Sequence, residues 1–72
     1  MSDPVSWKVM ERGWKVRDAS GKEIGKVDEI RGLPEDDIFD GITVKRGLLG
    51  KREYIPAERI AEILEGEVVL AA

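Results

Sequence analysis

Short β-branched segments separated by glycine-containing turns constrain the fold of this chain more than any other feature. The segment "GWKVRD" alternates Trp14 and Val16 with two basic residues, which is the two-residue period of a half-buried strand. The segments "ITVKR" and "EVVLA" share this β-branched character, and "ASG" at 19–21 and "EG" at 65–66 are typical turn sequences. Several short strands at close spacing predict an all-β fold, a small barrel or sandwich.

The segment "KEIGKVDEIRGL" at 22–33 breaks the strict alternation of a strand. Its apolar residues Ile24, Val27 and Ile30 are spaced by three, a pattern that a helix would also explain. Two glycines and the β-branched content favour a strand, and Gly25 inside it indicates a bulge or bend that changes which face later residues occupy. We therefore predict one strand with an irregularity near Gly25.

The middle of the chain predicts a loop followed by a hairpin. Residues 34–41, "PEDDIFDG", combine Pro34, several acids and an Asp40-Gly41 pair, so they are predicted as a loop with Asp40 setting the turn. Residues 42–55 are predicted as a hairpin with "GLLG" at 47–50 as its tip.

Residues 54–71, "YIPAERIAEILEGEVVLA", allow two structures. Pro56 can begin a helix that ends at Gly66, with apolar residues on one face. It can instead lie in a tight turn between short strands. Periodicity does not separate these alternatives by itself.

Two motifs resemble those of PRC-barrel domains. The family's opening motif is similar to "GWKVRDASGKEIGKV", and its ending is similar to "REYIPAERIAEILEGEVVL". The matching positions are Val16, Asp18, Gly21, Ile24, Gly25 and Val27 in the first motif, and Tyr54, Ile55, Pro56, Ile60, Val68 and Leu70 in the second. The resemblance covers about Gly13 to Leu70. It implies a small PRC-type β-barrel of about five or six short strands, with one helical turn near Pro56–Arg59 and residues 61–64 paired with 67–70.

Composition limits the chemistry that this chain can perform. Its 72 residues make one domain, which we divide into an N-terminal arm at 1–12 and a PRC-barrel domain at 13–72. Cysteine and histidine are both absent, which removes the most common nucleophiles, bases and transition-metal ligands. We predict that the chain is not an enzyme and has no cofactor. The acids at 34–41 do not match an EF-hand loop, which leaves weak cation binding as an open alternative.

The expected location is cytoplasmic, with no membrane span. No apolar run is long enough to cross a bilayer, and the first residues lack the apolar core of a signal peptide. The formal net charge is −3, with both signs interleaved, so nucleic acid would require a local basic patch.

The candidate partner-binding residues concentrate at the predicted hairpin tip. Leu48 and Leu49 are bracketed by basic residues in "KRGLLGKR", so this tip either meets a partner or folds back over its own barrel, and the second alternative is favoured. Two aromatic residues outside the tip complete the set, one in the arm and one in the acidic segment. The full set is Leu48, Leu49, Arg46, Lys51, Arg52, Trp7 and Phe39.

Two functions follow from the resemblance and these candidates. The first is a non-enzymatic protein-interaction module that self-associates, with a homodimer as one form and an unknown protein partner as another. The alternative is an RNA- or ribosome-associated adaptor, because PRC-barrel domains include the C-terminal domain of a ribosome maturation factor as well as part of the photosynthetic reaction centre H subunit. Net acidity ranks the adaptor second.

Overall fold

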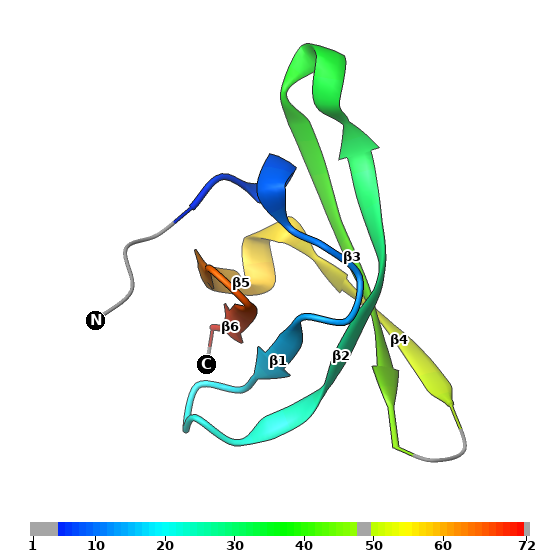
Figure 1. The fold of residues 1–72 in the computed structure, drawn as a ribbon, viewed down its shortest axis with the longest axis vertical. Helices are drawn as coiled ribbons and strands as arrows, with labels where there is room; N and C mark the ends of the chain where they lie inside the picture. The colour runs from blue at the N-terminus through cyan, green and yellow to red at the C-terminus, as the bar shows by residue number, and fades with distance from the viewer. Residues whose placement is uncertain (1–4, 48–49, 72) are drawn as a thin grey trace.

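A computed structural model describes residues 5–47 and 50–71 as one curled six-stranded sheet (Figure 1). The strands are β1 Lys15–Arg17, β2 Glu23–Leu33, β3 Ile38–Arg46, β4 Lys51–Pro56, β5 Ile60–Leu64 and β6 Glu67–Leu70. Three 3-10 turns, η1 Trp7–Val9, η2 Pro34–Asp36 and η3 Ala57–Arg59, are the only helical elements within the described residues. The predicted small all-β, barrel-like fold is confirmed.

The strand order β4-β3-β2-β1-β6-β5 leaves the barrel half open. Neighbouring strands are antiparallel, except that β1 lies parallel to β6. The edge strands β4 and β5 follow each other in sequence through η3, so the open side of the half-barrel lies where the chain passes from one edge to the other (Figure 1).

The concave face of the sheet holds the hydrophobic core. Every strand except β5 contributes fully buried or nearly buried residues, and the chain before β1 contributes one more. These residues are Met10, Val16, Val27, Ile42, Val44, Ile55, Val68 and Leu70. We call the opposite, convex side of β1 to β4 the outer face. Because successive side chains of a strand point to opposite sides, the neighbours of the core residues lie on it.

The strand predicted around Gly25 is present, and its irregularity lies next to this glycine. Val16 pairs with Gly25 but Arg17 pairs with Glu23, so Ile24 is the extra residue of a bulge. A Cβ atom on Gly25 would lie 2.5 Å from the carbonyl oxygen of Lys45 on β3, closer than real atoms approach. Glycine therefore permits the close crossing of β2 and β3. This bulge accounts for the spacing from Ile24 to Val27, and a second extra residue, Asp28, accounts for the spacing from Val27 to Ile30.

Residues 54–71 form strands, and the long-helix alternative is wrong. Pro56 ends β4 in an extended conformation and Ala57–Arg59 form the single helical turn. The chain then pairs with itself as β5 and β6 around Gly66, which has φ +88°. This matches the turn and the pairing that the family resemblance implies.

The loop predicted at 34–41 is shorter than expected. Only Pro34 to Asp37 leave the sheet, and Asp37 adopts the left-handed conformation, with φ 54°, that reverses the chain. Ile38 already pairs with Leu33, so residues 38–41 belong to β3, and Asp40 does not set a turn at Gly41. Ile38, Phe39 and Gly41 pair with the long β2, with Asp40 as the extra residue of a bulge, and these sheet partners outweigh the local turn preference of an Asp-Gly pair.

Candidate interaction surface

The predicted hairpin tip is only partly placed by the structure. Leu48 and Leu49 lie outside the described residues. Of the flanking basic residues, Arg46 forms an ion pair with Glu53 at 2.8 Å, and the Nε of Arg52 donates to Asp28 at 2.7 Å. Lys51 is exposed. The two arginines are therefore used for contacts within the chain.

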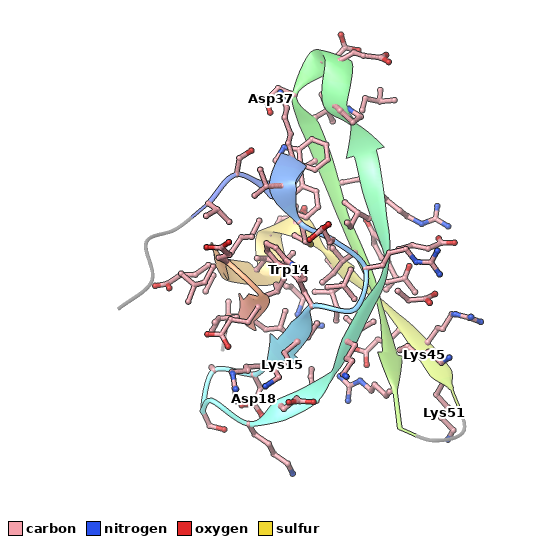
Figure 2. The ribbon with its side chains drawn as sticks, in the orientation of Figure 1. Trp14, Lys15, Asp18, Asp37, Lys45 and Lys51 are labelled. Atoms are coloured by element: carbon pink, nitrogen blue, oxygen red, sulfur yellow. The ribbon has the colours of Figure 1, made fainter. Side chains whose placement is uncertain are left out.

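Trp7 and Phe39 meet each other. Their rings stack with centroids 5.0 Å apart and planes 14° from parallel. The indole Nε1 of Trp7 donates to Asp37 at 3.2 Å, and the side-chain amine of Lys8 lies 3.5 Å from the same carboxylate. A Cβ on Gly32 would lie 3.0 Å from the Trp7 ring, so the indole packs directly over β2. These contacts fasten the arm to the β2–β3 hairpin (Figure 2, near Asp37).

The arm also borders an apolar groove on the open side of the half-barrel. The amide of Val5 donates to the carbonyl of Ile63 on the edge strand β5 at 2.8 Å. The groove has a volume of about 270 Å³ and is lined by Val5, Phe39, Ala57, Ile60, Ala61, Glu62 and Ile63. Pockets for small-molecule ligands usually have volumes of about 300–1,000 Å³. Its mostly apolar lining can accept an apolar side chain of a partner.

The clearest exposed apolar feature is the end of the β2–β3 hairpin. Leu33 and Ile38 lie directly opposite each other, with 53% and 52% of their surface exposed. The adjacent pair, Gly32 and Phe39, faces Trp7, so alternation along the strands turns Leu33 and Ile38 toward the outer face. Two large apolar side chains are therefore presented together to solvent.

A polar hollow adjoins these residues on the outer face. It has a volume of about 310 Å³ and is lined by Arg31, Asp40, Thr43 and Tyr54. The Tyr54 hydroxyl donates to the Asp40 carboxylate at 2.7 Å, and this hydrogen bond, with partial desolvation, raises the pKa of Tyr54. We call Leu33, Ile38, Arg31, Asp40 and Tyr54 together the exposed hairpin face.

Sequence reasoning missed this face because it placed residues 34–41 in a loop. Leu33 was then the last residue of one strand and Ile38 a loop residue, with nothing to set them opposite each other. One local signal was available: the apolar pair Ile38-Phe39 interrupts a run of acids, and two adjacent apolar residues of this kind favour a strand.

Asp18, by contrast, has a structural role. Its carboxylate accepts hydrogen bonds from the amides of Ser20 and Lys22 at 2.9 and 3.0 Å, and from the Ser20 hydroxyl at 2.7 Å. The Ser20 hydroxyl bond, followed by the Lys22 amide, lowers the pKa of Asp18. This aspartate therefore holds the turn at Gly21, whose φ is +90°.

Two further features, a metal site and a membrane-spanning helix, were sought in the part of the chain that the structure describes. Among residues 5–47 and 50–71, no group of three or more acidic side chains converges as a metal site would require. In the same ranges, no helix is long and apolar enough to cross a membrane. In comparisons with known proteins, no family model matches this sequence, and no curated protein matches it. What the chain binds must therefore be inferred from its own surfaces.

Proposed function

We propose that this protein is a non-enzymatic, cytoplasmic protein-interaction module of the PRC-barrel type that self-associates through its exposed hairpin face. The observation that carries the proposal is the pair Leu33 and Ile38, which are more than half exposed although they lie side by side in paired strands. Full burial of such a side chain is worth roughly 1.5–3 kcal/mol. A dimer in which a second copy covers both residues is stabilised by part of this free energy.

The polar residues of the same face favour a second copy as the partner. Arg31 and Asp40 carry opposite charges and line the same hollow beside the apolar pair. In a two-fold symmetric dimer each copy presents the same surface. Arg31 of each copy can therefore pair with Asp40 of the other, which gives two equivalent ion pairs. Arginine and tyrosine are also enriched among the residues that contribute most to binding, and Tyr54 lines the same hollow as Arg31.

The resemblance to PRC-barrel domains supports an interaction role rather than a reaction. The fold is a scaffold without a common chemistry, and function is assigned from sites rather than from folds. Here the surface features are an apolar pair, a charged hollow and a small groove, each suited to contact with a protein surface.

The test is the molar mass in solution, measured by light scattering across a range of concentrations. The variant L33T/I38T places β-branched threonine, which suits a strand, at both positions and removes most of the apolar area. The control V9T changes a residue of similar exposure, 54%, on the arm. We expect a dimer for the wild type and V9T, and a monomer for L33T/I38T. A wild type that stays monomeric at the highest concentration, or a double variant that dimerises as tightly, contradicts the proposal.

A further inference from the structure

The strand register places four basic residues in one line across the sheet. Lys15 on β1 lies opposite Lys26 on β2, Lys26 lies opposite Lys45 on β3, and Lys45 lies opposite Arg52 on β4. We call these four residues the cation row. All four are exposed, and the chain neighbours Val16, Val27 and Val44 are buried, so the row lies on the outer face.

This line is unfavourable for the isolated fold. Like charges directly opposite each other in a sheet are destabilising. Within the described residues, Lys15, Lys26 and Lys45 form no ion pair, whereas Arg52 is held by Asp28. At the β1 end of the row, Lys15 lies opposite Glu67 of β6. The Glu67 carboxylate, however, forms an ion pair with Arg17 at 2.8 Å. Three adjacent lysines therefore keep a concentrated positive field on a chain whose formal net charge is −3.

We propose that the cation row binds the phosphate backbone of a single-stranded nucleic acid. Neighbouring strands lie about 4.8 Å apart, so the four side chains span roughly 14 Å of surface. A nucleic acid strand carries one charge on every residue, and each lysine in the row can neutralise one phosphate. Lysine is well suited to this contact because its ammonium group acts as a point charge and needs no fixed planar geometry.

The curvature of the sheet favours a flexible strand over a flat anionic surface. The row crosses four strands of a half-barrel on its convex side, and Figure 2 shows two of its members, Lys15 and Lys45, on separate parts of the curled sheet. A bilayer surface touches a convex row at few points at once, whereas a single strand can bend along it.

The same field also attracts acidic protein segments. Such a segment matches four consecutive cations only where it is itself densely acidic, whereas every single-stranded nucleic acid supplies the required charge density. The sequence-independent nature of the contact also predicts no preference among bases.

The test is fluorescence anisotropy of a labelled 12-nucleotide oligo(dT), titrated with the full chain between 25 and 200 mM NaCl. Three to four phosphate contacts predict a slope of log affinity against log salt of about −2 to −3, which lowers affinity about 20- to 50-fold between 50 and 200 mM salt. The variant K15Q/K26Q/K45Q should lose at least about tenfold in affinity at 50 mM and reduce the magnitude of the slope by about two.

A matched variant tests whether binding depends on where the positive charges lie or only on how many there are. K8Q/K22Q/R59Q changes the net charge equally but leaves the cation row intact, and it should bind within about threefold of the wild type because distant exposed charges are screened. Thermal unfolding of the row variant, expected at the same temperature as the wild type or higher, shows that any loss of binding is not a loss of fold.

Three results would overturn the proposal. The first is no binding to the oligonucleotide at 25 mM NaCl, and the second is an equal loss of affinity in the two triple variants. The third is binding to vesicles rich in phosphatidylglycerol, or to poly-glutamate, that depends on the row and is tighter than binding to the oligonucleotide. The inference does not rest on self-association, and L33T/I38T should bind the oligonucleotide like the wild type.

Discussion

Replacement of Met10 by alanine tests whether the segment before β1 is part of the folded unit. Met10 is 5% exposed and packs into the core, although it precedes the region that the sequence motifs cover. Removal of a buried methionine side chain typically costs about 2–5 kcal/mol. Proteins have about 0.05–0.15 kcal/mol of stability per residue, so this chain of 72 residues has about 4–11 kcal/mol in total. Met10→Ala should therefore remove a large fraction of the stability.

Urea unfolding followed by tryptophan fluorescence measures this loss. A slope of about 1–3 kcal/mol per molar urea converts 2 kcal/mol into a midpoint lowered by about 1 M. In thermal unfolding the same loss lowers Tm by about 8–16 °C for a domain of this size. Val9→Ala is the matched control, because Val9 is the adjacent residue and is 54% exposed, so its free energy of unfolding should change by no more than about 0.5 kcal/mol. Equal shifts for the two variants would refute the assignment of Met10 to the core.

Three further predictions follow from local contacts. Gly25→Ala should destabilise the fold by about 1–3 kcal/mol in urea unfolding, because its Cβ would lie 2.5 Å from a β3 carbonyl oxygen; an unchanged midpoint would mean that β2 and β3 are not this close. The pKa of Asp18 is lowered in the folded state, so its contribution to stability is present above its ordinary value and is lost as the pH falls through the folded value. The stability of Asp18→Asn should therefore fall less than that of Asp36→Asn on acidification, and parallel curves would contradict the proposed turn contacts. Tyr54 is the only tyrosine, so its ultraviolet absorbance reports its ionisation directly, and the midpoint should lie above the ordinary value of 10.0 and decrease in Asp40→Asn.

The sequence alone determined the class of fold and most of the chain reversals. Val16 and its alternating neighbours identify a half-buried strand, and Gly21 and Gly66 occupy the positive-φ turn positions that their sequence context predicts. The chain after Pro56 forms the turn and strands expected from the PRC-barrel resemblance. These features are local: a turn needs one residue that tolerates positive φ, and a strand needs a two-residue period, so a few neighbouring residues specify each of them.

The tertiary structure decided where the surfaces lie. Local turn preference predicted a loop that extends through Asp40. Long-range pairing with β2 instead placed residues 38–41 in β3 and set Leu33 opposite Ile38. The cation row joins lysines from three strands far apart in sequence, and a shift of one residue in any register would turn one of them to the core side. Met10 entered the core because a half-barrel this small needs apolar side chains from outside its sheet. Register and packing depend on contacts across the whole chain, and no local pattern contains them.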